Sequence, residues 1–189
     1  MESVNDRRVK RTKTLLTNSL AVLMADKKIK DITVKELCEL ADINRGTFYL
    51  HYKDIFHMLE SVEQELLDQM QHIFEKYHSE SSDDFPYPLF LEIFQLVDRN
   101  SDICRVLLGP NGDISFIMKV RMLFRNQCIE SWVRLYSPAL MPHYEYFSNF
   151  IIYGCAGIME NWLMNKEDSP ETMAHLVTKL VSTGVTSLL

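Results

Sequence analysis

The fold is decided by residues 33–53, which read TVKELCELADINRGTFYLHYK. Thr33 can N-cap a helix, and Glu36, three residues later, completes a capping box. Apolar residues then recur at helical spacing, at Val34, Leu37, Cys38 and Ala41. The stretch therefore predicts a short helix that begins after Thr33 and ends near Ala41.

A second short helix is predicted after a turn at residues 41–43, with Asn44 as its N-cap. Phe48 and Tyr52 lie four residues apart and can pack inward. The side chains left outside are those of Arg45, Thr47, Tyr49, His51 and Lys53. A short helix that presents hydrogen-bond donors and a cation, rather than a mixture of Glu and Lys, suits the major groove of DNA.

The two predicted helices carry the motif Gly46-Thr47-Phe48-Tyr49-x-His51-Tyr52-Lys53-Asp54, preceded by Thr33-x3-Leu37-x3-Ala41. This motif resembles the helix-turn-helix of the tetracycline-repressor (TetR) family of transcription regulators, and the resemblance covers roughly residues 8–60. The family commonly has Gly in the turn and Ser at the cap, where this chain has Asp42 and Asn44. Asp tolerates the left-handed conformation, so we expect the turn to be kept.

The resemblance also implies which residues contact DNA. Arg45, Thr47 and His51 would face base edges or adjacent phosphates, and Tyr49 and Lys53 would hold the backbone. The helix that follows Thr33 would offer its N-terminal amides to a phosphate, and Gly46 would let DNA come close. The predicted DNA-binding residues are Thr33, Asn44, Arg45, Gly46, Thr47, Tyr49, His51 and Lys53.

Charge is divided unevenly along the chain, whose formal net charge is −6. Residues 1–53 hold 11 Lys and Arg against 7 Asp and Glu, or +4, whereas residues 54–189 hold 9 against 19, or −10. A basic head on an acidic body directs one end of the chain toward DNA. Five cations lie within residues 7–13, and we expect them to contact phosphates; the alternative is a solvated basic face.

Composition and motifs exclude several other classes of protein. Only six Gly and six Pro occur among 189 residues, and little period-2 alternation is visible, which predicts an all-α fold. No apolar run is long enough to span a membrane and the N-terminus is polar, so we expect a cytoplasmic protein without a membrane partner. Cys38, Cys104, Cys128 and Cys155 are expected to be reduced, buried thiols. No metal-ligand spacing, phosphate loop or nucleophile motif is present, so we expect no metal, no cofactor and no enzymatic activity.

The sequence predicts two domains. Residues 1–53 form a three-helix DNA-binding domain, with its helix-turn-helix at about 33–52, and residues 54–189 form a helical regulatory and dimerisation domain. A connecting helix over 54–77 joins them, because its apolar residues recur at spacings of four and three for over six turns. Further helices are predicted at 113–136, at 142–165 and from 170 to the C-terminus. The order of these parts resembles a C-terminal domain found in many TetR-type regulators of Gram-positive bacteria.

The last two helices are candidates for a dimer interface. Gly154 and Gly157 allow close approach of another helix, and Trp162 is expected to anchor the contact from the same side. The alternative is that both helices only close the core of one chain; the resemblance implies a four-helix interface, two helices from each chain. The predicted interface residues are Phe150, Gly154, Gly157, Ile158, Trp162, Met173, Leu176, Val177 and Leu180.

The middle helices hold large or pliable side chains that suit a pocket for a small apolar or aromatic effector. The alternative is that these side chains are ordinary core. The predicted pocket residues are Phe94, Phe116, Met122, Trp132, Tyr136 and Tyr153.

We therefore expect a homodimeric, ligand-responsive repressor that binds a pseudo-palindromic operator in double-stranded DNA. Two alternatives stay open. The same DNA-binding fold could carry a C-terminal domain that docks a partner protein, which would make the chain an activator or co-regulator. The chain could also be a helical interaction protein that does not bind DNA.

Overall fold

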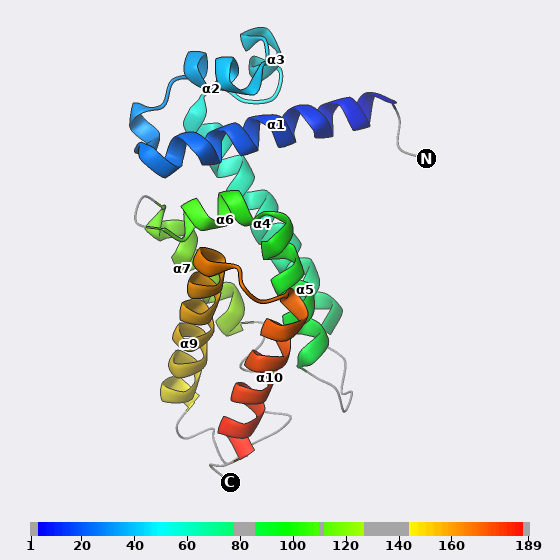
Figure 1. The fold of residues 1–189 in the computed structure, drawn as a ribbon, viewed down its shortest axis with the longest axis vertical. Helices are drawn as coiled ribbons and strands as arrows, with labels where there is room; N and C mark the ends of the chain where they lie inside the picture. The colour runs from blue at the N-terminus through cyan, green and yellow to red at the C-terminus, as the bar shows by residue number, and fades with distance from the viewer. Residues whose placement is uncertain (1–3, 78–85, 110–111, 127–143, 187–189) are drawn as a thin grey trace. The chain divides into compact units, whose positions relative to one another are not determined.

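The computed structural model describes residues 4–77, 86–109, 112–126 and 144–186, in which every regular element is a helix (Figure 1). This confirms the predicted all-α fold. The elements are α1 (Val4–Asp26), the 3₁₀ turn η1 (Ile29–Asp31), α2 (Val34–Ala41), α3 (Arg45–Tyr49), α4 (Ile55–Tyr77), α5 (Tyr87–Arg99), α6 (Ser101–Leu107), α7 (Ile114–Phe124), α9 (Tyr144–Asn165) and α10 (Pro170–Thr186).

The chain divides by its internal contacts into two compact units. The head unit comprises Met1–Leu66 and Asp102–Asp113, and the body unit comprises Leu67–Ser101 and Ile114–Leu189. This division differs from the boundary expected after Lys53, because the head also includes the first part of α4 and most of α6. Helix α4 therefore belongs to both units.

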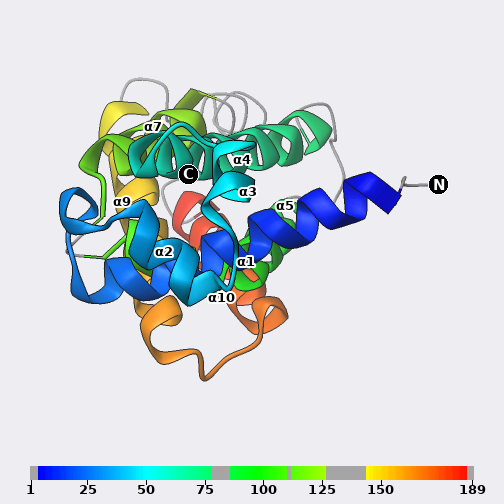
Figure 2. The ribbon, with the colours of Figure 1, turned by 90° about the horizontal axis from the view of Figure 1, so that it is seen from above.

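The core of the head is built from apolar residues on one side of each helix. Helix α1 packs against α2, and α2 packs against α3. Figure 1 and Figure 2 both show the first turns of α1 extending past α2 and α3. The fully buried side chains of the head include Leu16, Leu20, Met24, Leu37, Phe48 and Met58.

Helix α4 begins where Asp54 caps it, since the Asp54 Oδ1 accepts a hydrogen bond of 2.8 Å from the His57 backbone N–H. Every residue of the apolar stripe predicted along this helix is buried. Those residues are Ile55, Leu59, Val62, Leu66, Met70, Ile73 and Tyr77. The periodicity of the sequence thus identified both the helix and its inward face.

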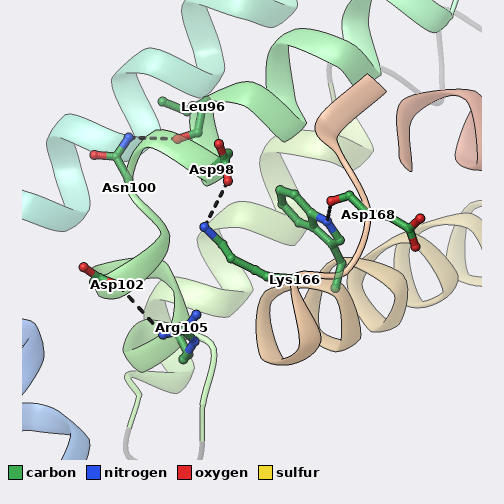
Figure 3. Close-up of polar contacts among 8 residues, drawn as sticks. Leu96, Asp98, Asn100, Asp102, Arg105, Lys166 and Asp168 are labelled. Carbon is green, nitrogen blue, oxygen red and sulfur yellow. Dashed lines mark hydrogen bonds and ion pairs between the residues drawn. The ribbon is translucent and has the colours of Figure 1, made fainter. Parts of the chain in front are cut away.

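In the body, α5 and α10 pack along each other. The Phe94 ring of α5 meets the Trp162 ring of α9 edge-on, with centroids 5.2 Å apart. Two polar contacts involve the C-terminal end of α9: Lys166 Nζ lies 2.9 Å from the Asp98 carboxylate (Figure 3), and Trp162 Nε1 donates to the Asp168 carbonyl oxygen at 2.8 Å. The Phe94–Trp162 ring contact and the Asp98–Lys166 ion pair join the C-terminal end of α9 to α5.

Several predicted features end differently or lie outside the described residues. The helix expected over 113–136 is described as α7 only to Phe124, with π-type turns at 125–126. Cys128 and the rest of that helix lie outside the described residues. Cys38 and Cys104 are buried thiols that form no disulfide, as expected, and Cys155 is half-buried and also forms none.

Two further properties concern the described residues alone. None of their helices combines the length and apolar character needed to cross a membrane. In the same ranges, no group of three His, Cys, Asp or Glu side chains could hold a metal ion.

Candidate nucleic-acid interface

The turn between α2 and α3 is held by two side-chain caps. Thr33 Oγ1 accepts a hydrogen bond of 3.2 Å from the Glu36 N–H, and Asn44 Oδ1 accepts one of 2.7 Å from the Gly46 N–H. Asp42 ends α2 in the left-handed conformation, with φ 53° and ψ 44°. Both N-caps and the tolerance of Asp in this turn were predicted from the sequence, and the structure confirms them.

Two aromatic residues fix the orientation of α3. Phe48 is fully buried and Tyr52 is 4% exposed, and their ring centroids lie 5.6 Å apart. Burial, and to a lesser extent the Glu65 carboxylate, raises the pKa of Tyr52 to about 12, so its hydroxyl stays protonated at neutral pH. The rest of α3 is thereby turned away from the core of the head.

The structure brings all eight predicted DNA-binding residues to the surface around α3 and the start of α2. Thr47 and His51 are half-buried, and the other six are exposed. Tyr49, at 58% exposure, lies beside Phe48, with ring centroids 5.4 Å apart. We call the outward side of this segment, formed by Arg45, Gly46, Tyr49, Leu50 and Lys53, the outer face of α3. Its two cations and its hydroxyl suit contacts with phosphates and base edges.

The cations of α1 fall into two groups. Arg7, Arg8, Lys10 and Arg11 are exposed in its first turns. Lys13 instead forms an ion pair with Glu65 of α4, which ties α1 to α4 within the head. The four exposed cations lie in the part of α1 that extends past α2 and α3 (Figure 2), where they are open to an anionic partner.

An open hollow of about 450 Å³ lies on the α2–α3 turn. Its lining residues are Lys35, Cys38, Glu39, Asp42, Ile43, Asn44 and Arg45. Burial raises the pKa of the Cys38 thiol, although the nearby Arg45 guanidinium partly opposes the shift. The thiol is therefore protonated at neutral pH and acts as a packing residue.

Sequence reasoning missed one residue of the outer face. Leu50 is 80% exposed, the highest value among the exposed large hydrophobic residues apart from Tyr146. The signal was present, because Leu50 lies two positions after the buried Phe48, or about 200° around the helix. The family motif leaves this position, between Tyr49 and His51, unspecified.

Comparison with known proteins gives the family. Residues 84–183, more than half of the chain, match the family TetR_C_8, described as the transcriptional regulator C-terminal region. The chain belongs to the TetR family. It is thus a transcriptional regulator with a DNA-binding helix-turn-helix, as the motif at residues 33–54 predicted.

Individual relatives agree with this assignment. Over 44 residues the chain is 43% identical to the HTH-type transcriptional regulator YxbF of Bacillus subtilis (strain 168), a match that covers 23% of this chain and 12% of that protein. The fold is shared with the fatty acid degradation regulator FadR from Bacillus halodurans, at 13% identity and a TM-score of 0.67, covering 90% of this chain and 94% of that one.

Two other solved structures share the fold. One is a TetR transcriptional regulator from Streptococcus agalactiae 2603V, at 21% identity and a TM-score of 0.59, covering 94% of this chain and 97% of that one. The other is NalD from Pseudomonas aeruginosa, the secondary repressor of the MexAB-OprM multidrug efflux pump, at 16% identity and a TM-score of 0.60, covering 93% and 96%.

The described residues that were predicted to line an effector pocket in this TetR-family chain do not lie together around one cavity in the structure. Phe94 and Phe116 are each 2% exposed and belong to the core, whereas Met122 and Tyr153 are 60% and 57% exposed. The Tyr153 ring lies under the Arg121 guanidinium, 4.6 Å from its centroid. The four residues are therefore split between core and surface; Trp132 and Tyr136 lie outside the described residues.

The predicted dimer residues separate into surface and core. Phe150, Gly154, Gly157, Leu176 and Leu180 are exposed and Ile158 is half-buried. Met173 and Val177 are buried inside the chain, at 6% and 1% exposure, so their packing partners lie in their own body unit. A Cβ added at Gly154 or Gly157 would meet nothing within 4 Å.

Placing Trp162 on the glycine side of α9 was wrong. Five positions separate it from Gly157, which turns it by about 140° around the helix. Trp162 is 4% exposed and packs on Phe94. The side that Gly157 does occupy, which we call the open face of α9, consists of Tyr146, Phe150, Tyr153, Gly157 and Met164, all exposed.

Proposed function

We propose that this chain is a homodimeric, ligand-responsive repressor that acts in the cytoplasm on a pseudo-palindromic operator. The observation that carries the proposal is the outer face of α3. Its cations and its tyrosine hydroxyl are exposed, while Phe48 and Tyr52 hold the helix from behind. A rigidly held helix with such a face can read base edges in the major groove.

The open face of α9 supports the dimer. Tyr146 is 81% exposed, Phe150 is 71% exposed and Tyr153 is 57% exposed, and Gly157, one turn beyond Tyr153, leaves room for close approach. Exposed rings grouped on one side of a helix favour a protein contact there. Since α9 of a second copy offers the same surface, a two-fold contact would cover both at once.

The dimer gives the proposed function its geometry. Two copies of α3 would enter successive major grooves when they lie about 34–36 Å apart. Helix α4 contributes to head and body alike, so an effector that binds the body and displaces α4 would change that separation. Operator affinity would fall without any change in α3 itself.

Selection of DNA by the full-length protein from a random-sequence pool tests the proposal. We expect a two-fold-symmetric site with half-site centres about 10–10.5 base pairs apart or a multiple of that spacing. Light scattering should give the mass of a dimer in the absence of DNA. An asymmetric single half-site bound by a monomer would contradict the dimeric mechanism, and a failure to enrich any sequence would contradict DNA reading altogether.

A further inference from the structure

Leu50 stands out among the residues around α3. It is 80% exposed, and it follows directly on Tyr49 at the C-terminal cap of the helix. Its backbone is still helical, with φ −70° and ψ −22°, and its N–H donates to the Gly46 carbonyl oxygen at 3.2 Å. Helical geometry therefore fixes the direction of its side chain as firmly as that of Tyr49.

That direction is opposite to the buried side of the segment. Phe48 and Tyr52 mark the buried side of the segment, and Leu50 lies about 160–200° from both. One turn earlier, the same line is occupied by Gly46, which has no side chain. Leu50 is thus more exposed than its neighbour Tyr49 and lies opposite the core, with Tyr49 on one flank and Thr47 on the other.

An apolar side chain at this place needs an apolar partner on the DNA. The most prominent apolar group on the edges of base pairs in the major groove is the C5-methyl of thymine. A leucine side chain cannot form hydrogen bonds or ion pairs with phosphates. The neighbouring cations can make those contacts instead. The surface around Leu50 is continuous with the predicted DNA contacts, which favours DNA over a protein as its occupant.

We propose that Leu50 packs against the C5-methyl group of a thymine in each half-site and so specifies an A·T pair there. The inference rests on the proposed reading of DNA by α3, and it names one of the bases that would be read. It predicts a thymine at a fixed position in both arms of the operator, recognised by shape and apolar contact and not by a hydrogen bond.

Deoxyuridine differs from thymidine by that methyl group alone, which permits a direct test. In a duplex carrying the site selected by the full-length protein, each thymine is replaced in turn by uracil, symmetrically in both half-sites. Binding is measured by fluorescence anisotropy at one fixed salt concentration. At one position we expect the replacement to weaken binding by about fourfold per half-site, as loss of one buried methyl implies.

The same series with Leu50→Ala decides the assignment. The variant should fold, because this side chain is 80% exposed, and it should bind the thymine and uracil versions of that position equally. Val22→Ala is the matched control, since Val22 is an exposed apolar residue of α1, at 59% exposure, and it should keep the wild-type response to the methyl group. Selection repeated with Leu50→Ala should lose the thymine preference at that position.

Two results would overturn the inference. If the wild-type protein selects a symmetric site but Leu50→Ala responds to every uracil replacement as the wild type does, the reading of DNA stands and the role of Leu50 falls. If the wild-type protein selects no sequence at all, the proposed function falls and takes this inference with it.

Discussion

The outer face of α3 and the open face of α9 both lie opposite a buried side, yet they differ in chemistry. The first carries Arg45, Tyr49 and Lys53 around the single apolar side chain of Leu50. The second carries aromatic rings around Gly157, and its large exposed residues are Tyr146, Phe150, Tyr153 and Met164. The exposure of a helix face therefore does not by itself indicate its partner. The polar and charged side chains on the face distinguish a DNA contact from a protein contact.

The two faces should also respond differently to solution conditions. Contacts between cations and phosphates release counterions, so they weaken steeply as salt is added. Apolar contacts between two copies depend on protein concentration and are little affected by moderate salt. A disturbance of one face, with the other face monitored in the same experiment, therefore separates DNA contact from dimer contact.

The largest effect is expected from salt. If a dimer neutralises six or more phosphates, through the first turns of α1 and through Lys53, raising salt from 50 to 200 mM should weaken operator binding by roughly 10³-fold or more. The dimer mass, measured by light scattering over the same range, should stay constant. An affinity that hardly changes would show that the exposed cations of the head do not touch the DNA backbone.

The next effect concerns the open face of α9. Gly157→Glu would place a charge at the centre of the proposed contact, where burial without a partner costs several kcal/mol. The fold should survive, since a Cβ at this position meets nothing within 4 Å. We expect a monomer by light scattering, unchanged helical circular dichroism, and loss of high-affinity operator binding because each head reaches only one half-site.

Asn149→Glu is the control for added charge. Asn149 is exposed on the same helix but lies about 80° around it from Gly157, so this variant should stay dimeric. A dimeric Gly157→Glu protein would show that two copies meet elsewhere, and the exposed Leu176 and Leu180 of α10 would be the next residues to test.

The local features of the head could be predicted from the sequence because neighbouring residues determine them. Thr33 and Asn44 each cap a helix by accepting a hydrogen bond from a residue at most three positions later. The left-handed conformation of Asp42 likewise depends on the residue type at that one position. The apolar stripe of α4 could be predicted in the same way, because it follows from the helical spacing of apolar residues in the sequence. The family motif added the DNA-binding role to residues whose exposure the structure then showed.

Features that depend on packing between distant residues could not be predicted. Trp162 is buried by Phe94, which lies 68 positions earlier in the sequence, and no local pattern records that contact. Lys13 belongs to the basic run of α1 by sequence but pairs with Glu65 of α4. The inclusion of α6 residues in the head has the same cause, because it follows from tertiary contacts.

Within the outer face of α3, backbone contacts should separate from base contacts. Lys53→Ala and Tyr49→Phe should weaken binding to the operator and to random DNA by similar factors, because phosphates carry no sequence information. Arg45→Ala or Thr47→Ala should relax base preference by roughly 1–3 kcal/mol at one position in each half-site. Competition binding with operator and random duplexes measures both quantities. An unchanged selected site for Arg45→Ala would assign base reading to another residue.

The smallest effect is expected in the body, at a carboxylate that touches neither face. Burial tends to raise the pKa of Glu92, but hydrogen bonds from Lys76 and Tyr77 outweigh it and lower that pKa below its ordinary value of 4.5. A carboxylate with a depressed pKa stabilises the fold above the ordinary value, and the contribution is lost as the pH falls through the folded-state pKa. Glu92→Gln should therefore lower the melting temperature at pH 7 by a few degrees at most, and the difference from wild type should shrink toward pH 3.

Glu75→Gln is the control, because it removes an exposed carboxylate from the same turn region of α4 and should melt like the wild type at both pH values. At pH 7, Glu92→Gln should still form the dimer and bind the operator with wild-type salt dependence, since the cations of α3 and the rings of α9 are unchanged. A melting difference that grew as the pH fell would mean that the protonated carboxyl is the form that the fold favours. Lys76 and Tyr77 would then not be stabilising a charge, and the ion pair would be incidental to the packing of α4 against α5.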